Sequence, residues 1–215
     1  MRKLIYFLAF FVALQLTVHA QKARGGLKAG IAISKYPGAV ETGMHTRSGP
    51  DLGMLWNINL GKYFSFQPTF NFWVQKGFNQ TSIILNASTT TTSLKVNCFE
   101  AQPNFVFNTG GKKGKFFIGG GPSAALALNG KWTRRSGTNV SKLDVQFGKK
   151  TTDDLRKVDF GVTGVTGFSY VGIMVSVCYN HGITDLNPHT NEGAIQSSYW
   201  GINLAFLLPF EQMKK

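Results

Sequence analysis

Apolar and polar residues alternate one by one through most of the chain after its first 20 residues. In residues 64–75 (FSFQPTFNFWVQ) every second position is Phe, Pro or Val, and the positions between them are mainly Ser, Gln, Thr and Asn. A period of two places successive side chains on opposite faces of a β-strand. Seven further segments alternate in this way, so the pattern predicts eight strands, over residues 26–34, 51–60, 64–75, 94–107, 115–128, 158–168, 171–181 and 199–210.

One of these segments, residues 94–107, departs from strict alternation. Leu94 and Val96 lie in phase with the polar positions of the segment rather than with its phenylalanines. A β-bulge adds one residue to a strand and re-aims the side chains that follow it. The pattern therefore predicts a bulge near Cys98.

The connections between the predicted strands alternate in length. Short connections of this kind are the periplasmic turns of up-and-down outer-membrane barrels, and long ones are their extracellular loops. Each strand is also long enough to cross a bilayer at a tilt, which takes about 9–11 residues. We therefore predict an all-β fold, an eight-stranded antiparallel up-and-down transmembrane β-barrel. Its short periplasmic turns are expected at 61–63, 108–114 and 169–170, and its long extracellular loops at 35–49, 79–93, 130–157 and 182–198.

Alternation alone does not say which face points outward, because a soluble barrel such as a lipocalin has its apolar face inside. An eight-stranded barrel has an interior only just wide enough for side chains to fill. The apolar face here carries most of the 18 Phe residues together with Trp56 and Trp200. That volume would crowd the lumen, whereas the Gly, Ser, Thr, Asn and Gln of the other face suit a narrow, hydrogen-bonded interior. We therefore expect the apolar face to lie in lipid.

Three prolines fall inside predicted strands. Pro68, Pro103 and Pro122 each remove a donor from the hydrogen-bond ladder, so they are expected near strand ends, at bulges or opposite gaps in the ladder.

Aromatic residues near strand ends are expected to form the interfacial girdles of a membrane barrel. These residues are Tyr63, Phe64, Trp73, Phe78, Trp132, Tyr170, Tyr199, Trp200 and Phe210.

The first 20 residues have the character of a targeting segment. Arg2 and Lys3 precede an apolar stretch over residues 4–16, and Val18-His19-Ala20 places small residues at the positions that precede a cleavage site. The stretch is too short to span a membrane comfortably as a retained helix. We predict a signal peptide over residues 1–20, export from the cytoplasm, and one outer-membrane barrel domain over residues 21–215.

Composition and charge narrow the range of partners. Charged residues make up 15% of the chain, against roughly 25% for soluble domains, which argues against a solvated, disordered chain. After removal of Arg2 and Lys3, 21 Lys and Arg face 10 Asp and Glu, a net charge of +11. A basic exported protein favours anionic lipid or glycan as its partner. Nucleic acid is not expected, because no basic platform interleaved with aromatic residues lies outside the strands.

The long connection over residues 130–157 is strongly basic, with a net charge of +5. One interpretation is a solvated, mobile loop. The other is contact with the phosphates of outer-membrane lipid, including lipopolysaccharide, because Lys and Arg form charge-assisted hydrogen bonds with such groups. The candidate residues for this contact are Lys131, Arg134, Arg135, Lys142, Lys149, Lys150, Arg156 and Lys157.

The remaining candidates for chemistry have simpler explanations. Cys98 and Cys178 lie on non-neighbouring strands, whose Cα atoms are usually more than about 7 Å apart, so we expect two free thiols facing the lumen. His181, Asp185 and His189 are spaced by four, but a strand end running into a loop gives that spacing no geometric meaning. We expect no catalytic residue, no metal and no cofactor.

Two further sets of residues are expected to serve the barrel itself. Gly119-Gly120-Gly121 lacks the GK[ST] of a phosphate-binding loop and is interpreted as a thin wall where the backbone needs space. Lys95, Glu100 and Asp159 are expected to enter a polar network in the lumen, where buried charges need partners.

Several segments resemble a known family, the PorT-like outer-membrane β-barrel proteins of Gram-negative bacteria. The resemblance covers nearly the whole chain after residue 20, although such barrels often end on an aromatic residue whereas five residues follow Phe210 here. It implies an outer-membrane location and recognition by the barrel insertion machinery, and it implies no specific activity. The motifs that carry it are GLKAGIAIS (26–34), FEAQPNFVF (99–107), FFIGGGPSAALAL (116–128), DFGVTGVTGFSY (159–170), YNHGITDL (179–186) and YWGINLAFLLPF (199–210).

These observations predict an outer-membrane barrel with a structural or interaction role and no catalysis. Envelope integrity, surface binding through the long loops and support of secretion all fit that description, and the sequence does not specify a protein partner. Two alternatives stay open at this point: a narrow channel or transport module, and a soluble secreted barrel that binds a small apolar ligand.

Overall fold

The computed structural model describes residues 23–36, 44–84, 88–109, 114–189 and 193–209, so the predicted signal peptide lies outside the described residues. None of the described residues forms a helix long and apolar enough to cross a membrane. The described chain forms antiparallel strands. They are β1 (Ala23–Lys35), β2 (Met44–Asn59), β3 (Phe64–Ile84), β4 (Ser88–Asn108), β5 (Gly114–Ser136), β6 (Asn139–Asp144), β7 (Val158–Tyr170), β8 (Ile173–Gly182) and β9 (Ser198–Pro209).

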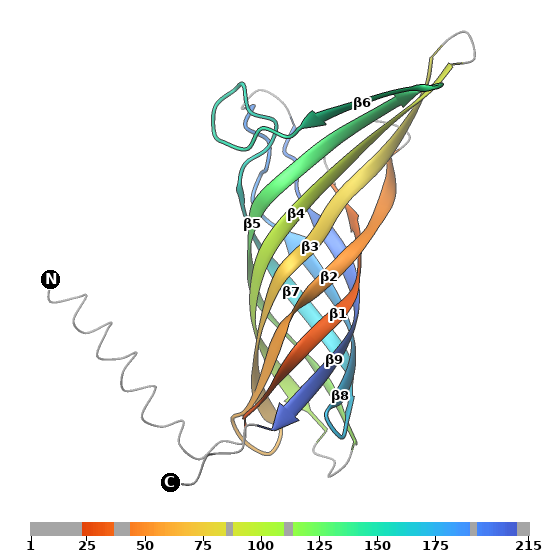
Figure 1. The fold of residues 1–215 in the computed structure, drawn as a ribbon. Helices are drawn as coiled ribbons and strands as arrows, with labels where there is room; N and C mark the ends of the chain where they lie inside the picture. The colour runs from red at the N-terminus through yellow and green to blue at the C-terminus, as the bar shows by residue number, and fades with distance from the viewer. Residues whose placement is uncertain (1–22, 37–43, 85–87, 110–113, 190–192, 210–215) are drawn as a thin grey trace, which may run out of the picture.

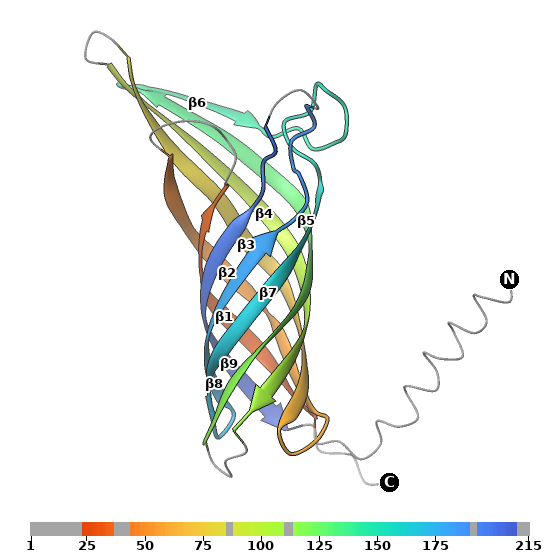
Figure 2. The same ribbon diagram turned by 180° about the vertical axis from the view of Figure 1, so that it is seen from behind.

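Eight of these strands close into a ring. The order is β4-β3-β2-β1-β9-β8-β7-β5, and an additional β4–β5 pairing joins the two ends. β6 pairs with β5 and lies outside the ring. Figures 1 and 2 show the strands winding at a steep tilt around one closed cylinder. The predicted fold, an eight-stranded antiparallel up-and-down barrel, is therefore confirmed.

The apolar face of the barrel is its outer face. Large rings on several strands are more than half exposed, among them Phe105 at 59%, Phe116 at 65% and Phe206 at 59%. The inward positions of the same strands are buried and mostly small or polar. The outward placement of the phenylalanines is confirmed, and in a bilayer the acyl chains cover the surface that they form.

A bulge on β3 changes the phase that the sequence predicted. In the pairing with β4, Asn71 faces Glu100 and the next pair is Val74 with Cys98, so one residue of β3 is extra. Phe72 and Trp73 are both exposed, and Val74 is turned inward and fully buried. The predicted outward position of Val74 is therefore wrong, because the bulge reverses the faces of the rest of β3.

The predicted bulge near Cys98 does not fall on β4. Leu94, Val96 and Cys98 are all buried, so β4 keeps its phase without interruption. The register with β5 does shift between Asn97 and Cys98, but the extra residue is Leu128 of β5. Leu94 and Val96 lie in phase with the polar residues because they belong to the lumen.

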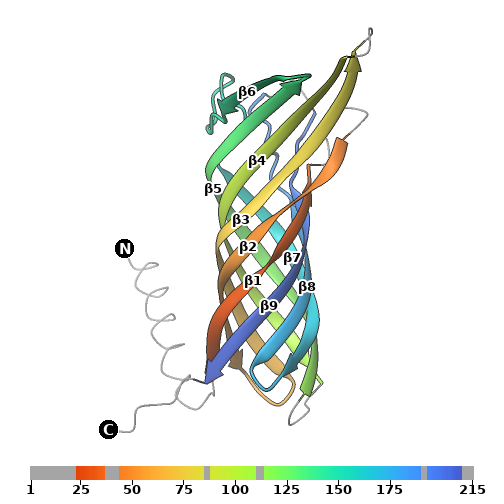
Figure 3. The ribbon, with the colours of Figure 1, turned by 45° about the vertical axis from the view of Figure 1, so that its right-hand side comes forward.

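The described part of the predicted 79–93 loop and the first half of the predicted 130–157 loop are extended strands instead. β3 and β4 stay paired residue by residue from Asn79↔Ser93 to Ile84↔Ser88, across the segment expected as the 79–93 loop. β5 continues to Ser136 and turns into β6. Figures 1 and 3 show these strand ends rising beyond the rim of the barrel, with β6 across the top. We call this sheet, residues 77–84, 88–95 and 130–144, the extracellular extension, because long connections mark the extracellular end of such barrels.

The three strand prolines lie beside gaps in the ladder. The β4–β5 pairing passes from Ala101↔Ala124 to Phe105↔Gly120, and the gap between these pairs holds both Pro103 and Pro122. The β2–β3 pairing likewise passes from Leu55↔Thr69 to Ile58↔Phe66, beside Pro68. The expectation for the prolines is confirmed, since each missing N–H falls where the neighbouring strand offers no pairing.

The glycine-rich stretch of β5 allows the same close approach. A Cβ atom on Gly119 would overlap the carbonyl oxygen of Phe105, and one on Gly121 would overlap that of Pro103. The interpretation of the glycines as a thin wall is confirmed.

The turn between β7 and β8 is a two-residue hairpin, Val171-Gly172, with positive φ at both positions, 45° and 89°. The sequence pattern predicts this tight turn at 169–170. It lies two residues later because β7 continues through Tyr170.

Candidate functional site

A buried ion pair lies at the centre of the lumen. The β3 bulge turns Lys76 inward, where its Nζ lies 2.8 Å from Oε2 of Glu100 and 4.0 Å from Oδ2 of Asp159. The side chains of Lys76 and Glu100 are only 2% and 0% exposed. The ammonium group also lies over the ring of Tyr199, 4.9 Å from its centroid. Charges buried to this degree are stable only when they are paired.

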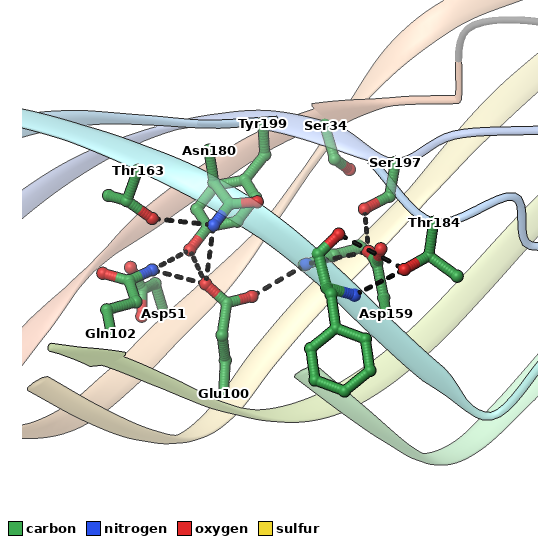
Figure 4. A network of polar contacts seen from close by, with 12 residues as sticks. Ser34, Asp51, Glu100, Gln102, Asp159, Thr163, Asn180, Thr184, Ser197 and Tyr199 are labelled. Carbon is green, nitrogen blue, oxygen red and sulfur yellow. Dashed lines mark hydrogen bonds and ion pairs between the residues drawn. The ribbon is translucent and has the colours of Figure 1, made fainter. Parts of the chain in front are cut away.

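Uncharged hydrogen-bond donors surround the other carboxylate oxygen of Glu100. Its Oε1 accepts hydrogen bonds from the Tyr199 hydroxyl at 2.6 Å, from Asn180 Nδ2 at 3.3 Å and from Gln102 Nε2. Asn180 Nδ2 also donates to Thr163 Oγ1 at 2.9 Å, and Ser197 Oγ donates to Asp159 Oδ2. Figure 4 shows these contacts converging on Glu100 and Asp159. We call this set, with Lys76, the lumen network; it joins β3, β4, β7, β8 and β9.

A second buried ion pair joins β1 and β2. Lys28 Nζ of β1 lies 2.8 Å from Oδ2 of Asp51 of β2, with side chains 6% and 0% exposed.

The predicted participation of Glu100 and Asp159 in a lumenal network is confirmed. That of Lys95 is wrong, because β4 keeps its phase and Lys95 points outward and is exposed.

Apolar layers enclose the lumen network from both ends. Toward the short turns, buried Leu55, Val106, Phe117, Met174 and Leu207 form one cluster. Toward the extension, residues from the segments 145–157 and 183–197 cover the barrel mouth. A backbone hydrogen bond from Arg156 N–H to the Leu186 carbonyl, at 2.9 Å, ties the two segments together, and one from Leu186 N–H to the Ile195 carbonyl, at 2.7 Å, closes the second segment on itself. This mouth cluster contains Tyr36, Phe78, Leu94, Val96, Cys98, Ala125, Ala127, Val145, Leu155 and Leu186.

The two cysteines face the lumen as predicted. Both are buried and free, and they lie in different places. Cys98 belongs to the mouth cluster, whereas Cys178 lies deeper, where its Sγ accepts a hydrogen bond from Asn203 Nδ2 at 3.6 Å. The expectation of two free lumenal thiols is confirmed.

The His181, Asp185 and His189 set is not gathered into one site. The His181 ring stacks on Tyr179, at 6.4 Å between centroids. Asp185 instead organises its own loop, because Oδ1 accepts 2.9 Å hydrogen bonds from the backbone N–H groups of Asn187 and Ile195. The residues described contain no group of three His, Cys, Asp or Glu side chains placed to hold a metal ion.

The hydrogen bond from the Asn187 backbone, joined by that from Ile195, lowers the pKa of Asp185. A carboxylate with a lowered pKa stabilises its loop above its unfolded-state pKa of about 3.9, and this contribution is lost as the pH falls through the folded-state value. We therefore expect the Asn187 and Ile195 amides to stay protected from hydrogen exchange at neutral pH and to lose protection in acid. Asp185→Ala should remove the protection at neutral pH, where the wild type keeps it. Equal protection of the two proteins at neutral pH would contradict the role of Asp185.

The aromatic residues predicted for the girdles divide into two groups. Those that point outward and are exposed at the two ends of the apolar belt are Tyr63, Phe64, Trp73, Tyr170 and Trp200. The prediction is wrong for three residues whose rings pack on the inner side, Phe78, Trp132 and Tyr199. Phe210 lies outside the described residues.

The structure also divides the eight predicted basic residues. Trp132 pairs with buried Leu94 and packs against Phe78, so its face of the extension is the inner one. Alternation then places Lys131 and Arg135 on the outer face of β5 and Arg134 on the inner face. Lys142, the register partner of Thr133, lies on the outer face of β6. Lys149, Lys150, Arg156 and Lys157 lie in the segment that runs back to the barrel mouth.

Side-chain amides mark the upper border of the apolar belt on this outer face. Asn97 Oδ1 accepts from Trp73 Nε1 at 2.9 Å and from Gln75 Nε2 at 3.0 Å, and Asn97 Nδ2 donates to Asn129 Oδ1 at 2.7 Å. We call the amides Gln75, Asn97 and Asn129, together with the Trp73 indole that donates to Asn97, the amide row; it runs across β3, β4 and β5. Below them lie the phenylalanines, and above them lies the basic extension.

Solved outer-membrane structures are similar to this chain at low identity. Ail, the attachment invasion locus protein of Yersinia pestis, solved with the heparin analogue sucrose octasulfate, has a TM-score of 0.41 and 8% identity, with 87% of this chain and 99% of Ail covered. Neisserial surface protein A has a TM-score of 0.37 and 11% identity, with 85% and 96% covered. The N-terminal β-barrel domain of Pseudomonas aeruginosa OprF has a TM-score of 0.26 and 7% identity, with 85% and 99% covered.

Curated proteins give no significant match to the chain. The outer membrane protein beta-barrel domain, by contrast, matches residues 19–187, a range that includes β1 through β8 and the lumen residues Lys76, Glu100 and Asp159. The matched range is well over half of the sequence, and the closed ring and outward apolar face agree with it. The chain belongs to the outer membrane protein beta-barrel domain family.

Proposed function

We propose that this protein is a closed scaffold of the outer membrane with a structural or interaction role, and that it catalyses no reaction. The observation that carries the proposal is the filled lumen, in which the lumen network lies between two apolar layers. Such an interior stabilises the barrel and leaves the extracellular extension as the part that meets other molecules. Envelope integrity, surface binding and support of secretion are the roles that this design serves, and the motifs quoted from the sequence support a place among PorT-like proteins.

The two alternatives fit the geometry less well. A channel would need a continuous aqueous path, but Lys76, Glu100 and Tyr199 meet across the lumen and the mouth cluster covers them. A soluble barrel would have its apolar face inside, whereas here the exposed phenylalanines would form an apolar surface far larger than soluble monomers display.

The partners that we propose follow from the surface. Lipid acyl chains surround the apolar belt, and the phosphates of lipopolysaccharide meet the basic residues on the outer face of the extension, Lys131, Arg135 and Lys142. We further propose export through the N-terminal signal peptide and folding by the barrel insertion machinery. A protein partner would contact the extension or the segments at the mouth, where the exposed polar backbone and side chains lie.

The first test combines gel mobility with conductance. The folded protein in detergent should migrate faster without boiling than after boiling, as a closed membrane barrel does. In planar bilayers it should give no current above that of protein-free bilayers, because the lumen is filled. Discrete conductance steps from the wild-type protein would support the channel instead, and extraction from membranes by salt alone would contradict the membrane barrel.

A further inference from the structure

Two lysines face each other on the outer surface of the extension. Lys95 of β4 and Lys131 of β5 are direct register partners, and both are exposed. Cβ atoms of directly opposed residues lie about 4.5–5.5 Å apart, and like charges at that spacing destabilise a strand pair. Lys142 of β6 lies on the same face, diagonal to Lys131. An anion placed among these three ammonium groups would remove the repulsion.

The depth of this lysine cluster, Lys95, Lys131 and Lys142, is set by the apolar belt. Phe99 of β4 is an exposed belt residue, and Asn97 of the amide row separates it from Lys95 on the same face. Four residues at ~3.3 Å each, tilted by roughly 35–45°, raise Lys95 by about 10 Å along the barrel axis. The lysines therefore lie just above the acyl chains, at the level of lipid headgroups.

We propose that the lysine cluster is a binding site for a phosphate monoester of lipopolysaccharide; this deepens the proposed function and rests on it. The extension lies at the extracellular end, where the outer leaflet carries lipopolysaccharide. A phosphate monoester carries about −1.5 to −2 charges at neutral pH, which matches a pair of lysines better than the single charge of a phosphodiester does. Lys95, which the sequence had placed in the lumen, thus becomes part of the site.

One carboxylate opposes binding at this site. Asp144 is the register partner of Lys131 on β6. The ion pairs found among the described residues all lie in the lumen, so Asp144 does not neutralise Lys131 through a direct contact. Its charge still lowers the potential at the cluster. Removing that charge should tighten binding of the phosphate.

The test compares purified variants in a non-ionic detergent by native mass spectrometry with bis-phosphorylated lipid A as the probe. Each lysine near a membrane surface contributes about 1 kcal/mol, so Lys95→Gln with Lys131→Gln should weaken binding about 30-fold. Asp144→Asn should tighten it about fivefold. The matched control, Arg134→Gln with Lys149→Gln, removes the same charge from the inner face and the mouth segment and should change affinity less than about threefold.

The same protein is then offered other ligands to identify the source of the phosphate. Dephosphorylated lipid A and phosphatidylglycerol should bind the wild type no better than they bind the Lys95 and Lys131 double variant. Equal losses in the lysine and control variants would overturn the site while leaving anionic-lipid contact, and the proposed function, in place. Preference for phosphatidylglycerol would overturn the monoester, and binding of neither lipid by the wild type would overturn lipid contact independently of the conductance result.

Discussion

Replacing Leu204 with Arg is expected to lower the free energy of unfolding by about 2–4 kcal/mol, the cost of a cation on the lipid face near the bilayer midplane. Leu204 lies in the middle of β9, between Ala29 of β1 and Val175 of β8, and 52% of it is exposed outside the barrel. Water would solvate an Arg at such an exposed site without penalty. The expected loss therefore arises only if hydrocarbon surrounds this position.

The matched control is the same substitution at Leu143. This residue of β6 is 67% exposed and belongs to the extension, above the belt. Leu143→Arg should change stability by no more than about 0.5 kcal/mol, as surface substitutions usually do. Both variants are refolded into phospholipid vesicles and unfolded in urea. Equal stabilities of the two variants would contradict the placement of Leu204 and the apolar belt in the hydrocarbon of the bilayer.

The faces of the barrel were predictable because burial on one side enforces strict alternation. On β7 and β9, for example, Phe160 and Phe206 lie outside and Gly161 and Ala205 lie inside, as the sequence pattern indicates. Membrane barrels need lipid-compatible side chains at every second position. A face that must contact hydrocarbon therefore appears in the sequence as an apolar residue at every second position.

The extension was missed because that constraint ends above the membrane. The paired residues Asn79↔Ser93 through Thr81↔Thr91 are polar on both faces of the sheet. Where water contacts both sides, alternation disappears and the segment has the composition of a loop. The β-branched threonines were the available indication of strand structure.

The β3 bulge was missed for a different reason. Phe72, Trp73 and Val74 are all apolar, so the pattern does not show which of them is the extra residue. Two successive aromatic residues in a strand were the only indication. Because the phase was misassigned, Lys76 was not recognised as the buried cation that Glu100 requires. Tyr199 and Asn180 could not be recognised either, because they are about 100 and 80 positions from Glu100 and contact it only when the ring of strands closes.

The substitution Lys76→Met is expected to have the largest effect on stability, a loss of about 3–5 kcal/mol. It leaves Glu100 buried with its Oε2 facing an apolar side chain, and no other described cation lies within ion-pair distance of this carboxylate. Glu100→Leu alone should cost less, because Asp159 still lies 4.0 Å from Lys76. The measurement is urea unfolding of the refolded protein in vesicles.

The double variant separates loss of the ion pair from loss of packing. Replacing a whole buried pair with apolar residues of similar volume is often neutral or stabilising, so Lys76→Met with Glu100→Leu should recover most of the loss. A coupling energy of several kcal/mol would then assign the effect to the unpaired charge. Additive losses would mean that water reaches both groups, and a hydrated centre would contradict the closed lumen on which the proposed function depends.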